Sequence, residues 1–432
     1  MTSGASDRYR IGYACITLGE HDIAYRTCRQ ANATPDLLMQ IIAHNLDALE
    51  RAIDYNRRNG IRLFRISSDL IPFGSSPVNQ LAWWELFAPQ MARIGDKIVQ
   101  SGMRVSMHPG QYTVLNSTRD SVVQNAIADL IYHNRVLDNL GVGPSHKIIL
   151  HVGGVYGDKS QAIERFKSIW YSLDTSIRQR LVLENDDKSY TISDVLELGS
   201  ALGIPVVYDN LHNRLMPSDT GKSDDYWINL CRPLWREQDG RQKIHYSQQN
   251  PMKNNGSHSE SIQIDEFLAF VDDLTVPDLD IMLEVKDKNL SARKCILAVA
   301  EKPVMRELEV EWSRYKYTVL EHDPDDYAQI RRLLNDKMSS PVLEFYHLLE
   351  HAMAQPVTIG HAENAAMHVW GYFKYKANET EKTQVMAAMD RLRMTDDQEQ
   401  ILKSLQPLKN QLWKLTEKYT DRYLGESLYF RV

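Results

Sequence analysis

The chain has 432 residues, of which 43% are hydrophobic and 25% charged, the composition of an ordinary globular protein long enough to bury a full core. No apolar run approaches the roughly 20 residues needed to cross a bilayer, and the first residues lack the apolar segment of a secretory signal, so we expect an intracellular protein without membrane contact. The 50 basic and 57 acidic residues give a net charge of −7, which argues against binding nucleic acid by bulk positive charge. It does not exclude a nucleic-acid enzyme whose acidic residues hold metal ions.

Four cysteines are scattered along the chain with no CxxC pair: Cys15, Cys28, Cys231 and Cys295. This pattern excludes a thiolate zinc site and a disulfide framework, and it fits a reducing compartment.

Short apolar runs alternate with amphipathic helical segments from residue 10 to about residue 300. The predicted strands are 10–16, 62–66, 104–107, 147–150, 181–183, 205–208, 242–244 and 280–283. The predicted helices, whose apolar residues recur at three and four positions, are 37–59, 83–101, 121–140, 159–173, 192–202, 264–273 and 291–299.

This alternation is typical of βαβ units, and eight strands over about 290 residues favour a (β/α)8 TIM barrel within the α/β class. An open doubly wound sheet is the competing fold, but no GxGxxG follows the first strand. We therefore expect a barrel domain over residues 1–305. Residues 306–432 carry helical periodicity and are expected to form a helical C-terminal extension, with Pro341, Pro356 and Pro407 as helix boundaries.

Side chains that can bind metal ions follow six consecutive predicted strands. These are His108, His151, Glu184, Asp209, His212, His245, His258 and Glu284. A (β/α)8 barrel brings the carboxyl ends of its strands onto one face, so these residues are expected to converge there. Imidazoles and carboxylates are ligands of zinc, manganese and similar divalent ions, and eight of them exceed the needs of one ion. The sequence therefore predicts two or three divalent metal ions.

Lys243 precedes His245 by two residues, so on a strand both side chains point into the barrel mouth. An ammonium group there would be repelled by metal cations. Either its pKa is strongly lowered, or it is a carbamate that bridges metals, or it leans away to pair with Glu184, Asp209 or Glu284. Lys286 lies two residues beyond Glu284, where it could reach a substrate phosphate or be solvated.

An HxxEH pattern at residues 347–351 has the spacing of an inverted zinc-protease motif on a helix. In a charged helical segment without an obvious third ligand, a solvated helix face explains His347 and His351 more simply.

Eight segments in the correct order resemble the UV-damage DNA endonuclease family over about residues 10 to 299. They are RIGYACITLG (10–19), FRISSDLIPFGS (64–75), HPGQYTVLNS (108–117), HVGGVYGDK (151–159), LENDDKSYT (183–191), YDNLHNRL (208–215), KIHYSQQNP (243–251) and LEVKDKN (283–289). The resemblance implies a (β/α)8 barrel with up to three divalent metals, Mn²⁺ being expected and Mg²⁺, Co²⁺ or Zn²⁺ being alternatives. It also implies nicking of DNA immediately 5′ to cyclobutane dimers, 6-4 photoproducts and some abasic sites, leaving a 3′-hydroxyl and a 5′-phosphate.

Position by position, the resemblance places the family's metal ligands on the eight residues found at the strand ends, and a modified lysine on Lys243. The expected catalytic residues are Lys243, Glu184 and Glu284. Lesion or DNA contacts are expected from Gln111, Tyr112, Tyr13 and Lys286. The substrate would be double-stranded DNA carrying UV lesions, bound by a monomer in the cytoplasm, at the nucleoid if the source is bacterial.

The residues themselves agree with a wedge near the metals, since Gln111 and Tyr112 follow a glycine on a loop three residues past His108. A flat ring and an amide there could enter a base stack, where damage lowers the cost of unstacking. Without the resemblance, ordinary packing at the barrel rim is the simpler interpretation of Tyr112.

The chain departs from the family at two positions. Where some members have a histidine ligand after IPFxS, it reads Ser75-Ser76-Pro77, which implies fewer protein ligands for one metal. Thr17 stands where some members have asparagine, which puts one lesion contact in question.

Metal-assisted phosphodiester cleavage is thus the leading hypothesis. The alternatives are a metal-dependent sugar isomerase or epimerase on the same barrel, and a non-catalytic DNA-damage binding module if Ser76 reflects a lost metal.

Overall fold

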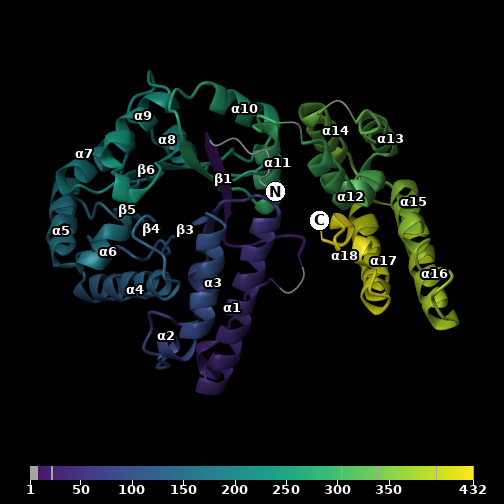
Figure 1. Ribbon diagram of the computed structural model, residues 1–432, viewed down its shortest axis with the longest axis horizontal. Coiled ribbons are helices and arrows are strands. Elements are labelled where there is room, and N and C mark those ends of the chain that lie inside the picture. Colours follow the sequence, from purple (N-terminus) through teal and green to yellow (C-terminus); the bar gives the residue numbers. More distant parts are fainter. Residues whose placement is uncertain (1–7, 21–22, 303, 338–339, 396, 432) are drawn as a thin grey trace. The chain divides into compact units, whose positions relative to one another are not determined.

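A computed structural model describes residues 8–20, 23–302, 304–337, 340–395 and 397–431, and these form two compact units (Figure 1). The first unit contains the described residues up to 17 and from 23 to 299. The second contains residues 18–20 and the described residues from 300 onward.

The first unit is a closed barrel of eight parallel strands, each paired with the next and β8 with β1. The strands are β1 (Tyr9–Ala14), β2 (Leu63–Ile66), β3 (Arg104–Met107), β4 (Lys147–His151), β5 (Leu181–Glu184), β6 (Val206–Asp209), β7 (Lys243–Tyr246) and β8 (Leu279–Leu283). Nearly all strand residues are buried, as expected for a parallel sheet covered on its outer face by helices. The predicted (β/α)8 barrel is confirmed.

Eleven α-helices are described in this unit, and they surround the strands in Figure 1. They are α1 (Pro35–Arg58), α2 (Trp83–Leu86), α3 (Ala88–Gln100), α4 (Asp120–Asn139), α5 (Lys159–Ser172), α6 (Thr175–Arg180), α7 (Ile192–Leu202), α8 (Asn210–Leu215), α9 (Asp224–Cys231), α10 (Ile264–Asp272) and α11 (Asn289–Ala298). The prediction of one helix over 83–101 was wrong, because the chain breaks at Phe87 (φ −110, ψ 11) between α2 and α3.

Charged side chains close the amino-terminal end of the barrel. Arg104 at the start of β3 lies 2.7 Å from Asp280 on β8, and both side chains are almost fully buried. Lys147 at the start of β4 lies 2.5 Å from Asp239, again out of solvent. Buried charges are tolerated when they are paired, and these pairs fill the end of the barrel opposite the strand carboxyl ends.

The second unit is helical throughout its described residues. Its helices are α12 (Met305–His322), α13 (Pro324–Leu333), α14 (Val342–Ala354), α15 (Ile359–Trp370), α16 (Glu379–Arg393), α17 (Gln398–Lys418) and α18 (Arg422–Gly425). Its core contains side chains from α12, α15, α16 and α17, among them Leu320, Val369, Met389 and Leu412.

Two of the three predicted proline boundaries agree with the structure, since Pro341 directly precedes α14 and Pro356 lies between α14 and α15. Pro407 does not end a helix, because it lies inside α17. Leu405, Leu408 and Leu412 are all buried around it, and this continuous apolar face keeps the helix intact across the proline.

Among the described residues, no helix is both long enough and apolar enough to span a lipid bilayer.

Candidate metal centre

The register of the barrel brings the strand-end ligands side by side. His151 on β4 is the Cα partner of Glu184 on β5, and Asp209 on β6 is the partner of His245 on β7. His108 directly follows β3, and Glu284 directly follows β8. In a parallel barrel all of these positions lie at the carboxyl end, which is where active sites of this fold are built.

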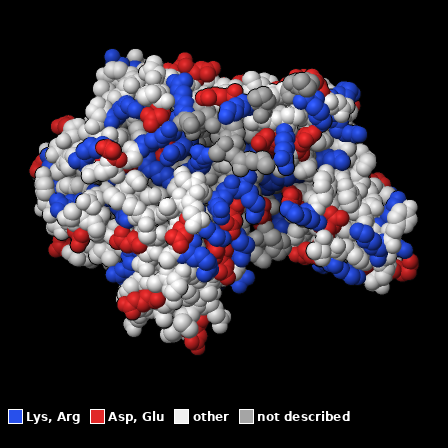
Figure 2. Space-filling view, in the orientation of Figure 1, with Lys and Arg blue, Asp and Glu red and all other residues white. Residues whose placement is uncertain are grey.

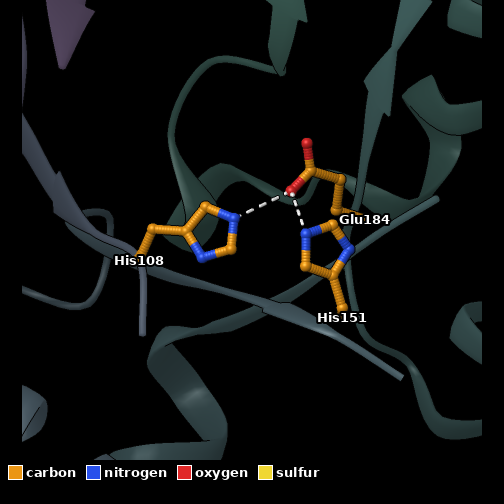
Figure 3. A group of neighbouring side chains, drawn as sticks. All are labelled: His108, His151 and Glu184. Atoms are coloured by element: carbon orange, nitrogen blue, oxygen red, sulfur yellow. Dashed lines mark hydrogen bonds and ion pairs between the residues drawn. The ribbon is translucent and has the colours of Figure 1, made fainter. Parts of the chain in front are cut away.

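Glu184 lies at the centre of this cluster (Figure 3). Its Oε2 atom is 3.1 Å from Nε2 of His108 and 3.5 Å from Nε2 of His151, and both rings point toward that oxygen. Its other oxygen, Oε1, accepts a hydrogen bond from Nδ1 of His245. The carboxylate is almost fully buried, so its negative charge is balanced only by the groups around it.

Three overlapping groups of ligand atoms share Glu184, with the atoms of each group within 4.8 Å of one another. The groups are His108–His151–Glu184, Glu184–Asp209–His212 and Glu184–His245–Glu284. His258 is adjacent, with Nε2 3.7 Å from Oε2 of Glu284. All eight predicted ligands therefore lie in one cluster, and their nitrogen and oxygen donors suit divalent transition metals.

Asn185 organises the ligands that follow β5 and β6. Its side chain accepts a hydrogen bond from the Asp209 amide (2.9 Å) and donates one to the Asp209 carbonyl (3.1 Å). Its own carbonyl accepts a hydrogen bond from Nδ1 of His212 (2.9 Å). This bond leaves Nε2 of His212 available as a ligand, and such orienting contacts are typical of metal-binding histidines.

The electrostatics of the cluster favour a bound cation. Burial opposes ionisation of Glu184, yet the neighbouring rings of His245 and His151 hold its pKa well below the usual value. Burial, against the effect of His212, raises the pKa of Asp209 to about 7, with the charges of Glu184 and Glu284 adding to the rise. Oδ2 of Asp209 is buried without a hydrogen-bond partner among the described residues. An unpaired buried carboxylate oxygen that faces other ligands fits a metal ion.

Lys243 lies below His245 on β7 and is fully buried. Its Nζ atom has no hydrogen-bond partner among the described residues, so the alternative in which it pairs with Glu184, Asp209 or Glu284 is wrong. Burial, followed by the charge of Arg104, holds its pKa well below the usual value. A lowered pKa means that the amine of Lys243 is more readily neutral. A neutral amine is also the form that can become a carbamate, so both alternatives stay open.

Arg65 and Lys288 are members of this site that the sequence interpretation missed. Nη2 of Arg65 donates to Oε1 of Glu284 and lies 3.0 Å from Nε2 of His245. Lys288 has a positive φ (52), and burial lowers the pKa of its ammonium group against the charges of Cys15 and Glu284. The arginine within an otherwise apolar strand, LFRI, was a signal that could have indicated Arg65.

The loop after β3 carries Gln111 and Tyr112, the two residues predicted to form a wedge. Tyr112 is 79% exposed and Gln111 is also exposed. The loop is held by Thr113, whose amide donates to the carbonyl of Gly110 (2.9 Å) and whose hydroxyl donates to Asp129 (2.6 Å). Because the loop is held in place and most of the Tyr112 ring is exposed to solvent, the ring is available to contact a bound ligand. Packing at the barrel rim does not account for so exposed a ring.

The other predicted contact residues differ in accessibility. Lys286 is exposed. Tyr13 is fully buried, and its hydroxyl contacts Thr17 (2.6 Å) and Asn56 (2.8 Å). Oγ of Ser76 accepts a hydrogen bond from the amide of Val78 (3.3 Å), and among the described residues Ser76 has no part in a ligand group.

His347 and His351 of the HxxEH pattern do not belong to the same group of possible metal ligands among the described residues. His351 instead lies 2.5 Å from Asp326, near Asp323. Asp323 caps α13 by accepting from the amides of Asp325 and Asp326, which accounts for its position. A solvated helix face therefore stays the simpler explanation of the HxxEH pattern.

Comparison with known proteins matches two different families to the amino-terminal and carboxyl-terminal parts of the chain. Residues 9–312 match the family described as UV-endonuclease UvdE. Residues 316–432 match a second family, described as a protein of unknown function, DUF1722.

Relatives agree with the first match. The UV DNA damage endonuclease of Clostridium perfringens (strain 13 / Type A) is 39% identical over 357 residues, which cover 81% of this chain and 84% of that protein. The UV DNA damage endonuclease of Bacillus cereus (strain G9842) is 33% identical over 274 residues, covering 60% and 82%. The crystal structure of SacUVDE superposes with a TM-score of 0.63 at 35% identity, covering 70% of this chain and 99% of that one. This chain therefore belongs to the UV-endonuclease UvdE family.

Proposed function

We propose that this protein is a DNA repair endonuclease that nicks the damaged strand immediately 5′ to UV photoproducts. The lesions would be cyclobutane dimers, 6-4 photoproducts and some abasic sites, and the products a 3′-hydroxyl and a 5′-phosphate. The observation that carries the proposal is the convergence of three ligand groups on one buried carboxylate, Glu184, in a chain of the UvdE family.

The cluster would hold two or three divalent metal ions, with Mn²⁺ the first choice and Mg²⁺, Co²⁺ or Zn²⁺ as alternatives. The ligands would be His108, His151, Glu184, Asp209, His212, His245, His258 and Glu284. When bound, such ions activate water and neutralise charge on a scissile phosphate. Ser76, whose hydroxyl is engaged with Val78, would leave one ion with fewer protein ligands.

The expected catalytic residues act around this cluster. Glu184 and Glu284 would hold the ions in place, and Arg65 would keep Glu284 in position through their direct contact. Lys243, buried and without a hydrogen-bond partner in the part of the chain that the structure describes, would serve either as a neutral amine or, after reaction with carbon dioxide, as a carbamate that bridges metals. Lys286, exposed two residues beyond Glu284, would contact a phosphate of the bound strand.

Lesion recognition would depend on Gln111 and Tyr112, which occupy the space left when damaged bases leave the stack. Because damage weakens stacking and pairing, this contact selects lesions without reading sequence. Tyr13 would line the pocket for the displaced bases. Since its ring is fully buried in this structure, that role requires the covering chain to move.

The substrate would be double-stranded DNA carrying UV lesions, bound by a monomer inside the cell, at the nucleoid if the source is a bacterium. We assign the nuclease to residues 1–305 and a separate helical extension to residues 306–432, in line with the two family matches. A sugar isomerase or epimerase is less well supported, because it would need a closed small pocket, whereas the loop that follows His108 carries an exposed aromatic ring, Tyr112.

The test is incubation with Mn²⁺ and an end-labelled duplex that carries one thymine dimer, with an undamaged duplex and His151→Ala protein as controls. We expect one nick 5′ to the dimer, and none with either control. Intact damaged DNA in the presence of fully metal-loaded wild-type protein would contradict the proposal, as would equal cleavage of the undamaged duplex.

A further inference from the structure

The second unit carries a surface patch of aromatic and basic side chains, here called the aromatic-basic patch. It consists of Trp312 and Lys316 on α12, Tyr327 and Arg331 on α13, Tyr372 just after α15, and Tyr423 on α18. None of these residues has a part in the metal centre, and the patch lies within the region matched by the family of unknown function apart from Trp312.

Ring contacts order the aromatic side chains of the patch in two groups. The rings of Trp312 and Tyr327 are 5.3 Å apart, and those of Tyr372 and Tyr423 are 6.0 Å apart and nearly parallel, at 11°. Buried Tyr317 lies beneath, with its ring 6.3 and 6.4 Å from the same two tyrosines and its hydroxyl 2.8 Å from that of Tyr372. This packing fixes the ring orientations before any ligand binds, which lowers the entropy cost of stacking on them.

The outer tyrosines are accessible in spite of this packing. Tyr372 is 36% exposed and Tyr423 is 37% exposed, while Tyr317 is only 3% exposed. Nucleobases are planar partners that stack on accessible aromatic rings such as these.

The two cations of the patch lack an acidic partner. Among the described residues, neither Lys316 nor Arg331 has a carboxylate within ion-pair distance. They lie on aromatic rings instead, Arg331 5.7 Å from the ring centre of Tyr327 and Lys316 5.3 Å from that of Tyr317. Partial burial, followed by the charge of Arg331, lowers the pKa of Lys316.

Several other surface cations of the same unit are paired with acids. Examples are Lys382 with Glu379, Lys403 with Glu399, Lys418 with Glu381 and Arg422 with Glu426. Lys316 and Arg331 differ from these in that the charge of one acts on the other beside aromatic rings, and an anion between them would relieve their repulsion.

We propose that the aromatic-basic patch binds single-stranded DNA, with bases stacked on the tyrosines and phosphates on Lys316 and Arg331. A duplex hides the faces of its bases, whereas a single strand offers both base faces and closely spaced phosphates. This inference goes beyond the proposed nuclease, because it assigns a second DNA contact to the helical unit. It does not require the barrel to cleave anything.

The first test measures binding of a fluorescein-labelled oligothymidylate to the full-length, metal-free protein over a range of salt concentrations. Replacing Lys316→Ala and Arg331→Ala together should weaken binding about tenfold and reduce the salt slope by about 1.4, the loss of two single-strand phosphate contacts. The matched control is Arg391→Ala with Lys414→Ala, two exposed cations of the same unit outside the patch, which should change neither quantity. Equal effects of the two pairs would overturn the proposal.

The second test separates stacking from charge. Tyr372→Ala should weaken binding about fivefold or more without changing the salt slope, and Tyr372→Phe, which keeps the ring, should bind as wild type. Loss of affinity in the phenylalanine variant equal to that in the alanine variant would count against stacking. Tighter binding of oligouridylate than of oligothymidylate would overturn the assignment to DNA.

The third test locates the contact. Photo-crosslinking with an oligonucleotide that carries 5-iodouracil should label peptides containing Trp312, Tyr327, Tyr372 or Tyr423, and labelling of barrel peptides alone would overturn the proposal. Nicking of the dimer duplex should survive in the Lys316→Ala/Arg331→Ala protein. Because cleavage and single-strand binding are read separately, failure of this inference can be told apart from failure of the proposed nuclease.

Discussion

Glu184 is the residue on which the metal centre depends most, because its two oxygens belong to all three ligand groups. We expect Glu184→Gln to lower bound Mn²⁺ at every position and to reduce nicking by at least about 100-fold, since the neutral amide is a poor metal ligand. Metal content by mass spectrometry and nicking of the dimer duplex are the measurements. The matched control is Glu164→Gln, an exposed glutamate on α5, which should keep both. Full metal content in Glu184→Gln protein would show that the cluster is not the metal site.

Tyr112 tests the wedge independently of the metals. Its ring is 79% exposed and its side chain is not among the predicted ligands, so Tyr112→Ala should leave metal content unchanged. It should reduce the preference for dimer-containing over undamaged duplex by about tenfold, by removal of one base-stacking ring. The measurement is binding competition between the two duplexes. Lost metal in this variant, or an unchanged preference, would contradict the proposed role.

At the residue scale, the sequence predicted that these side chains converge, because a parallel barrel places every strand end on the same face. To predict that His108, His151 and Glu284 lie on this face, it was sufficient that each stands at the end of an apolar run. Arg65 and Lys288 were not predictable in the same way. Arg65 contributes through a contact with Glu284 that forms only in three dimensions, and arginine and lysine fall outside the set of common metal ligands.

At the element scale, an ion-pair cluster joins α1 to α3. Glu50 on α1 lies 2.8 Å from Arg93 and 2.9 Å from Lys97 on α3, and its side chain is only 16% exposed. The hydrogen bond from Arg93, with the contact from Lys97, lowers the pKa of Glu50 from 4.5 to about 2. The carboxylate is therefore more acidic in the folded than in the unfolded chain.

A depressed carboxyl pKa contributes stability that is fully present above the unfolded pKa and lost as the pH falls through the folded one. We expect Glu50→Gln to lower the free energy of unfolding of the barrel by about 1–2 kcal/mol at pH 7, allowing for solvent screening. The difference from wild type should shrink between about pH 4.5 and pH 2. Denaturant unfolding at several pH values measures it, and a difference that stays constant down to pH 3 would contradict the assignment.

The order of elements was predictable from apolar periodicity, but their ends and interruptions were less so. Short α6, α8 and α9 carry too few residues to show a helical period, and they were missed. The break at Phe87 and the continuation of α17 through Pro407 depend on tertiary packing, since buried leucines on both sides of the proline hold that helix in place. Local propensity does not contain this information.

At the scale of the whole molecule, the 50 basic and 57 acidic residues nearly balance, and the net charge is −7. On the face shown in Figure 2, lysine and arginine are interspersed with acidic side chains over both units. Binding of DNA would therefore depend on local sites such as the metal centre rather than on a general positive surface.

Two compact units with separate cores predict two thermal transitions. Mn²⁺ at about 100 times its dissociation constant should stabilise only the barrel, by about 2.7 kcal/mol, and raise its midpoint by about 5 °C. Leu408→Ala, in the core of the helical unit, should lower only the other transition. Differential scanning calorimetry with and without Mn²⁺ tests this expectation, and a single transition that shifts as a whole with both changes would contradict it.

The central claim is that side chains spread over six strand ends hold several metal ions around one shared carboxylate. Anomalous diffraction from crystals grown with Mn²⁺ tests it most directly. The account predicts two or three manganese peaks beside Glu184, each bounded by residues of one of the three ligand groups. Manganese found elsewhere, or ordered rings of His108, His151 and His245 with no peak between them, would contradict it.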